Sequence, residues 1–216
     1  VLVDLVAAAK SADERRAYLG ALRRLPQGTA AVSRMLATNQ WNVVRDIAEL
    51  SLGKTEVVNW TNDKFEENGL LTYPPDCSPS QKYPLVLYIH GGPRAASLMN
   101  FSSQAQLMAA KGWLVFQPNY RGSDNLGRAY QGAISNDAGE GPGRDVMAGI
   151  ETLKARGIVD ESRMAVTGWS YGGYMTAWML GHYDIWKVAV AGAAVTDQLD
   201  QQTISDGASG RGGANS

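Results

Sequence analysis

The stretch MAVTGWSYGGYMTAWML, residues 164–180, decides the fold because it has the pattern of a short apolar strand, a tight turn and a helix. The turn GWSYG (168–172) matches G-x-S-x-G. In this pattern a sharp strand-to-helix turn lifts a serine oxygen above the strand end, and glycines let the backbone crowd the turn without a Cβ clash. Gly168 and Gly172 therefore predict a nucleophile elbow around Ser170. The simpler alternative is a serine that only caps the helix.

A second turn, HGGP (90–93), follows directly on the apolar run LVLYIH (85–90). A Gly-Gly turn at the end of an early strand can aim the backbone N–H of Gly92 at the oxygen that becomes negative during acyl transfer. The N–H of Tyr171 would be the second donor of this oxyanion hole. We expect His90 to brace its own loop, and its alternative role is that of a substitute base.

Apolar runs and helical stretches alternate along the chain from about residue 56. Strands separated by helices in this way are typical of a parallel sheet covered on both faces, so the predicted class is α/β. Functional groups of such sheets gather at the carboxyl ends of the strands. The expected strands cover residues 56–60, 68–73, 85–90, 113–119, 163–168 and 187–195, and the expected helices cover 102–112, 144–157 and 170–181.

The composition limits the classes of partner and cofactor that the chain is expected to bind. With 20 Lys and Arg against 21 Asp and Glu, the net charge of −1 gives no reason to expect nucleic acid or an anionic membrane as partner. Cys77 is the only cysteine, which excludes an internal disulfide. Two separated histidines and one cysteine form no metal-ligand spacing, and NYRGSDNLG (119–127) follows no nucleotide fingerprint. We expect neither a metal nor another cofactor.

The two ends of the chain differ from its centre. Residues 1–37 predict two or three short amphipathic helices of unclear role, with Ser11 and Glu14 as a capping box, and residues 38–216 form the α/β part. The opening apolar stretch is too short to span a bilayer, and no signal peptide is recognisable. The compartment stays open, with a slight preference for the cytoplasm. A first residue Val and a Gly/Ser-rich tail favour a piece of a longer protein.

Residues 38–210 resemble the prolyl oligopeptidase family of serine peptidases, and within it the acylaminoacyl-peptidase and dipeptidyl-peptidase branch. The resemblance implies an α/β-hydrolase catalytic domain that cleaves short peptides, normally preceded by a β-propeller that admits only small substrates. It assigns the nucleophile to Ser170 and the oxyanion donors to Gly92 and Tyr171. It rests on segments in the family's order and spacing, namely 52–60, 82–93, 117–153, 157–180 and 193–207.

Two further family positions and one departure follow from the same resemblance. Arg121 and Asp145 match the family, and we interpret them as ion-pair or capping residues. Residues 1–37 stand where the propeller is expected and do not have the pattern of propeller blades.

A base for Ser170 is not evident. The only later histidine, His182, is twelve positions on, which places it about 18 Å along the same predicted helix, beyond hydrogen-bond reach. We interpret it as a helix C-terminal residue. Asp197 follows the last predicted strand, but the resembled family takes its acid from a later one. We therefore expect the triad Asp and His to lie beyond Ser216, and the chain alone to be a poor peptidase that self-associates through an uncovered sheet edge.

Two other functions are compatible with the sequence. A carboxylesterase on the same fold shares the elbow and the Gly-Gly turn. A noncatalytic binding or assembly module would explain the absent histidine. Cleavage preference, a free or acylated substrate amino end, and the oligomeric state are left open.

Overall fold

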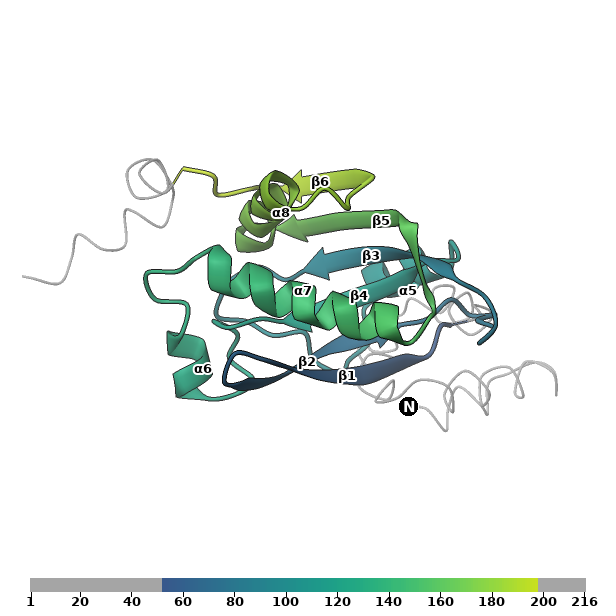
Figure 1. Ribbon diagram of the computed structural model, residues 1–216, viewed down its shortest axis with the longest axis horizontal. Coiled ribbons are helices and arrows are strands. Elements are labelled where there is room, and N and C mark those ends of the chain that lie inside the picture. Colours follow the sequence, from purple (N-terminus) through teal and green to yellow (C-terminus); the bar gives the residue numbers. More distant parts are fainter. Residues whose placement is uncertain (1–51, 198–216) are drawn as a thin grey trace, which may run out of the picture.

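The structure, a computed structural model, describes residues 52–197, and the predicted helices of residues 1–37 lie outside that range. The described residues form one six-stranded sheet with helices packed against it (Figure 1). The strands are β1 (Thr55–Asn62), β2 (Phe65–Thr72), β3 (Tyr83–Ile89), β4 (Leu114–Asn119), β5 (Val159–Trp169) and β6 (Val188–Gly192). The helices are α5 (Ser103–Ala109), α6 (Arg128–Gly132), α7 (Glu140–Ala155) and α8 (Tyr171–His182).

The strand order is β1-β2-β4-β3-β5-β6. Strands β4, β3, β5 and β6 pair in parallel, whereas β2 runs antiparallel to both β1 and β4. The parallel strands therefore bring their carboxyl ends to one edge of the sheet, where binding sites of α/β proteins are built. The predicted α/β class is confirmed, and the first two strands add an antiparallel hairpin.

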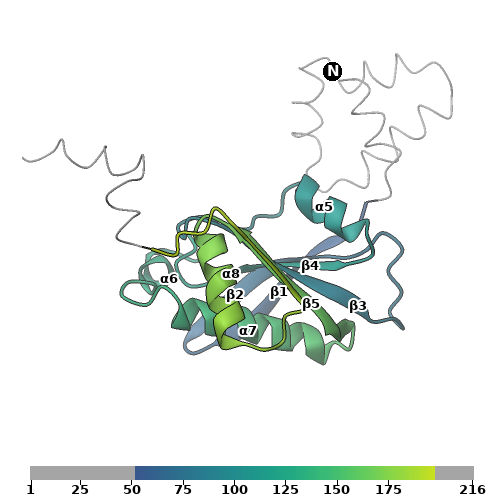
Figure 2. The same cartoon turned by 90° about the horizontal axis from the view of Figure 1, so that it is seen from above.

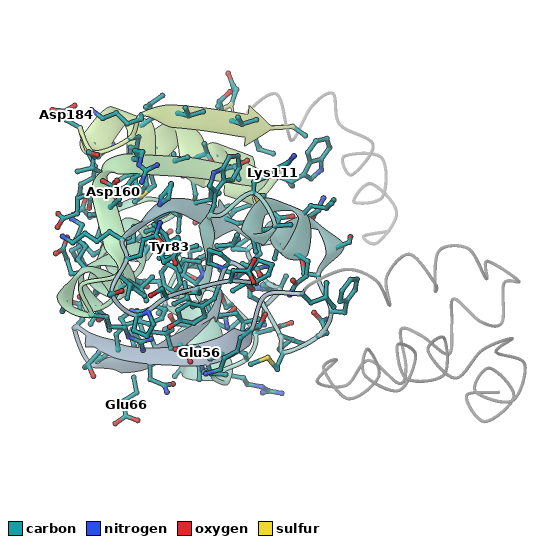
Figure 3. The ribbon with its side chains drawn as sticks, turned by 90° about the vertical axis from the view of Figure 1, so that its right-hand side faces the viewer. Glu56, Glu66, Tyr83, Lys111, Asp160 and Asp184 are labelled. Atoms are coloured by element: carbon teal, nitrogen blue, oxygen red, sulfur yellow. The ribbon has the colours of Figure 1, made fainter. Side chains whose placement is uncertain are left out.

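Helices cover both faces of the sheet. Helices α7 and α8 pack on one face over the main core, and α5 lies on the opposite face (Figure 2). Tyr83 of β3 lies among the core side chains, whereas Glu66 of β2 points away from the sheet (Figure 3). The large, fully buried side chains include Phe116, Tyr120, Tyr130, Leu71, Leu85, Leu87, Ile89, Ile150, Leu153 and Met175.

Helix α7 begins at Glu140, four residues before the predicted start at 144. The segment GPG (141–143) is part of the helix, because Pro142 lies in the first helical turn, where its missing N–H removes no helical bond. Gly143 is required by packing, because a Cβ there would lie 2.2 Å from Trp178 Cζ3. Strand β5 also begins earlier than predicted, at Val159, and the short helix α6 was not anticipated.

Two negative observations concern residues 52–197 only. None of the helices there is both long and apolar enough to cross a bilayer. No three His, Cys, Asp or Glu side chains in that range are grouped so that they could hold a metal ion.

Candidate active site

The turns that follow β3 and β5 meet at the carboxyl edge of the sheet. Residues 90–93 leave β3, and Ser170 directly follows β5. The two turns are in contact, because a Cβ on Gly91 would lie 2.8 Å from Trp169 O and 3.4 Å from Ser170 Cβ. The two segments that the sequence singled out, 80 residues apart, are therefore brought together.

Ser170 occupies a strained turn between β5 and α8. Its φ of 59° and ψ of −119° lie in a region that residues other than glycine rarely adopt. Its N–H donates to Gly192 O over 2.9 Å, which ties the turn to β6. The side chain makes no capping hydrogen bond to α8. The helix-cap interpretation therefore fails, and this backbone geometry is the one that a nucleophile elbow needs.

The glycines on either side of Ser170 are required by close backbone approach. A Cβ on Gly168 would lie 2.4 Å from Gly172 O, and a Cβ on Gly172 would lie 2.2 Å from Ile89 O. Real Cβ atoms do not come so near to backbone oxygens, so any larger residue would push β3, β5 and α8 apart.

Two backbone amides belong to the turns that meet at Ser170. Tyr171 is the first residue of α8, so its N–H has no acceptor within the helix. Gly92 has φ of +124°, a conformation that only glycine adopts readily, and a cis peptide bond joins it to Pro93. Neither amide donates to another backbone group among residues 52–197. Both are thus available to a ligand, as the predicted oxyanion hole requires.

His90 is held by its own loop and by the turn after β4. Its Nδ1 lies 2.8 Å from Gly91 O, and its Nε2 lies 2.9 Å from Ser123 Oγ. Its ring stacks on Tyr120 with centroids 4.4 Å apart. Burial lowers the pKa of His90 below its ordinary value. Because both ring nitrogens are engaged, the geometry favours a bracing role over that of a substitute base.

His182 lies at the end of α8 opposite to the elbow. His182 is the last residue of α8, where its Nδ1 contacts Trp178 O at 2.7 Å and its ring stacks on Trp178 at 3.8 Å. The length of α8 thus separates it from Ser170, as the sequence predicted. Asp197 is exposed and lies five residues beyond the end of β6.

Arg121 and Asp145 form a buried ion pair under the site. The Nε and the backbone N–H of Arg121 each donate to Asp145 Oδ2 over 2.8 Å, and its Nη2 donates to Asp145 Oδ1 over 2.6 Å. Nη2 also contacts Asp63 in the β1-β2 turn. This pair links the turn after β4 to α7, which agrees with the structural role expected for both residues.

Sequence reasoning missed three groups near this site, because their environment comes from residues distant in the chain. Tyr120 is fully buried, and its hydroxyl donates to His90 O over 2.7 Å. The Tyr171 hydroxyl donates to Ala138 O over 2.6 Å. Glu67 is buried beside the Arg121 ion pair although it stands in a polar stretch of β2. Tyr120 stands between Asn119 and Arg121 in the sequence, so no local pattern signals its burial.

A sequence model of the prolyl oligopeptidase family matches residues 99–209, just over half of the chain. The chain belongs to the prolyl oligopeptidase family. Its α/β-hydrolase fold and its likeness to serine peptidases follow from that membership.

Curated peptidases resemble the chain in sequence. The uncharacterized peptidase YuxL of Bacillus subtilis is 35% identical over 152 residues, covering 70% of the chain and 23% of the relative. Human dipeptidyl peptidase 8 is 36% identical over 139 residues, covering 61% of the chain and 16% of the relative. The chain thus spans about a quarter or less of these relatives.

Solved acylaminoacyl peptidase structures share the fold. The uncomplexed acylaminoacyl peptidase of Pyrococcus horikoshii superposes with a TM-score of 0.68 at 28% identity, covering 73% of the chain and 26% of that protein. An acylaminoacyl peptidase in complex with Z-Gly-Gly-Phe-chloromethyl ketone gives a TM-score of 0.69 at 28% identity, with the same coverage.

Proposed function

We propose that the complete protein is a serine peptidase that hydrolyses short peptides through an acyl-enzyme on Ser170. The observation that carries this proposal is the strained elbow at Ser170, with the free amides of Gly92 and Tyr171 beside it. Membership in the prolyl oligopeptidase family supports it.

In the proposed reaction, Ser170 Oγ attacks the carbonyl carbon of the peptide and passes its proton to a histidine base. The carbonyl oxygen becomes negative and accepts hydrogen bonds from the N–H groups of Gly92 and Tyr171. The C–N bond then breaks as the base returns the proton to the leaving amine. Water, activated by the same base, finally releases the acyl group from Ser170.

We further propose that the base and its acid come from a part of the protein other than these 216 residues. The chain contains two histidines, His90 and His182. One has both ring nitrogens engaged, and the other lies at the far end of α8. Without a base, only the oxyanion hole and substrate binding remain, which leaves a small fraction of the rate.

A short peptide is the proposed substrate. The related acylaminoacyl peptidase was solved with the peptide-derived Z-Gly-Gly-Phe-chloromethyl ketone, and other relatives are dipeptidyl peptidases.

The first test is labelling with a fluorophosphonate probe, read by intact mass, on the complete protein and on the 216-residue chain. We expect one label per complete protein, none on its Ser170→Ala variant, and at most slow labelling of the shorter chain. A folded complete protein that stays unlabelled would contradict the proposal and favour a noncatalytic module.

A substrate panel separates peptidase from carboxylesterase. We expect the complete protein to cleave aminoacyl or N-acylaminoacyl anilides as well as p-nitrophenyl esters, because the preorganised amides stabilise the oxyanion of either substrate. Turnover of esters alone would favour the carboxylesterase.

A further inference from the structure

We infer that Tyr120 and Ser123 are positioning residues of the proposed oxyanion hole, because they hold the His90 ring in the one orientation and tautomer that aims the N–H of Gly92. The inference rests on the proposed function and deepens it. It assigns a role to the turn that follows β4, from which none of the proposed catalytic groups comes.

The direction of the Gly92 N–H is set by the peptide unit that it shares with Gly91. This unit is planar and trans, so the C=O of Gly91 and the N–H of Gly92 point in opposite directions. Gly91 O lies 2.8 Å from His90 Nδ1. A carbonyl can only accept, and the Tyr120 hydroxyl, 3.1 Å from Nδ1, already donates its hydrogen to His90 O. The hydrogen-bond network therefore assigns the imidazole proton to Nδ1. The imidazole therefore fixes the plane of this peptide and, with it, the direction of the Gly92 N–H.

Ser123 fixes the other side of the imidazole. With the proton on Nδ1, Nε2 is an acceptor, and the Ser123 hydroxyl donates to it over 2.9 Å. Ser123 is fully buried, so water cannot easily take its place. Burial also lowers the pKa of His90, which keeps the ring neutral and Nε2 free to accept.

Tyr120 contacts both the ring and the backbone of His90. Its ring stacks on the His90 imidazole at 18° between planes, and its hydroxyl donates to His90 O over 2.7 Å. The other neighbour of its ring is Tyr171, with centroids 5.7 Å apart. Tyr171 carries the second proposed oxyanion donor, and its own hydroxyl is bound to Ala138 O. One buried tyrosine thus contacts both residues on which the two amides depend.

The tautomer is measured on the complete protein by ¹⁵N NMR of the imidazoles, and the His90 signals are assigned by their loss in a His90→Gln variant. We expect a protonated Nδ1 and an unprotonated Nε2 for His90, while the exposed His182 serves as the internal comparison. Ser123→Ala removes the donor to Nε2, so we expect it to shift the His90 signals toward a mixture of tautomers. A wild-type His90 that carries its proton on Nε2 would overturn the inference.

The effect on catalysis is measured on the complete protein with the variants Tyr120→Phe and Ser123→Ala. A misplacement of about 1 Å at a reacting group can cost about a hundredfold in rate, so we expect kcat to fall about tenfold to a hundredfold with KM unchanged. Such a split is expected because the oxyanion forms only in the transition state.

Tyr83→Phe is the matched control. Tyr83 is also a buried tyrosine of the core, and its hydroxyl accepts from Ser78 N over 2.7 Å, but it lies at the opposite end of β3 from His90. We expect this variant to keep its kcat. An equal kcat for Tyr120→Phe, Ser123→Ala and Tyr83→Phe would overturn the inference.

The two readouts separate this inference from the proposed function. An unlabelled, inactive wild-type protein contradicts the proposed function, and the NMR measurement still decides whether the turn after β4 sets the tautomer of His90. An active protein with the wrong His90 tautomer contradicts the inference alone.

Discussion

Glu67 is buried on the covered face of the sheet, where Trp60 Nε1 donates to its Oε2 over 2.6 Å. Its Oε1 is buried and receives no hydrogen bond from the described residues. Burial, and then the neighbouring Asp145 carboxylate, raise the pKa of Glu67 to about 9. We therefore expect Glu67 to be protonated at neutral pH beside Asp145, whose carboxylate pairs with Arg121.

The raised pKa makes stability depend on pH. Unfolded Glu67 releases its proton above about pH 4.5, whereas the folded protein keeps it, so stability falls as the pH rises toward 9. Gln imitates the protonated acid, and we expect Glu67→Gln to be more stable than wild type by about 1–3 kcal/mol at pH 8. Urea unfolding at pH 5 and pH 8 measures this difference. Glu66→Gln, at the exposed neighbour, is the control, and identical pH dependence for wild type and Glu67→Gln would refute the protonated state.

At the scale of elements, helices α7 and α8 approach each other through glycines rather than through large apolar side chains. Trp178 of α8 lies over the start of α7, where a Cβ on Gly143 would be 2.2 Å from its ring and a Cβ on Gly139 would be 2.4 Å from it. The same α8 carries Ser170 at its other end. The packing of the two helices thus sets the direction in which α8 leaves the elbow.

A pair of glycine substitutions tests this helix contact. Alanine favours a helix over glycine by about 1 kcal/mol, so Gly→Ala is stabilising wherever the methyl group has room. Gly181 of α8 has no atom within 4 Å of its Cβ position, and we expect Gly181→Ala to be neutral or stabilising. We expect Gly143→Ala to lose about 1–3 kcal/mol through overpacking against Trp178. Thermal unfolding distinguishes them, and equal melting temperatures would show that the helices adjust freely.

At the scale of the whole molecule, the two edges of the sheet differ. Strand β1 is an edge strand whose core side is covered by α7, whereas β6 exposes Val188 by 57% and Val190 by 59%. Trp169, on the neighbouring strand, is exposed by 65%. An apolar strand with an unpaired edge among the described residues is a site for association with another chain.

We expect the isolated 216-residue chain to self-associate through β6. A Val190→Lys substitution places a charge on that strand, so we expect it to shift the population toward monomer in sedimentation velocity. Leu107→Lys is the control, because Leu107 is exposed to a similar extent but lies on α5. A wild-type chain that sediments as a monomer at all concentrations would contradict this prediction.

Local signals in the sequence were sufficient for much of the fold. The elbow at Ser170 and the strands around it are encoded within a few residues. Helix α8 begins and ends one residue later than the predicted helix 170–181. The predicted start of α7 was wrong. Position 143 is a glycine because Trp178, 35 positions away, leaves no room for a side chain, and the local sequence does not show this. The antiparallel pairing of β2, the burial of Glu67 and the contacts of Tyr120 likewise depend on chain segments that no local pattern joins.

The hydrogen bond from Ser170 N–H to Gly192 O has a dynamic consequence. Gly192 is the last residue of β6, which is the edge strand of the sheet formed by residues 52–197. Strands at a margin open to solvent more often than central ones, and local opening of this kind is independent of global unfolding. Each time β6 frays at its end, the amide of the nucleophile is released and the strained turn can relax. We therefore expect the conformation of the elbow to last only while the end of β6 stays paired. A contact that stabilises β6 also stabilises the backbone conformation of Ser170.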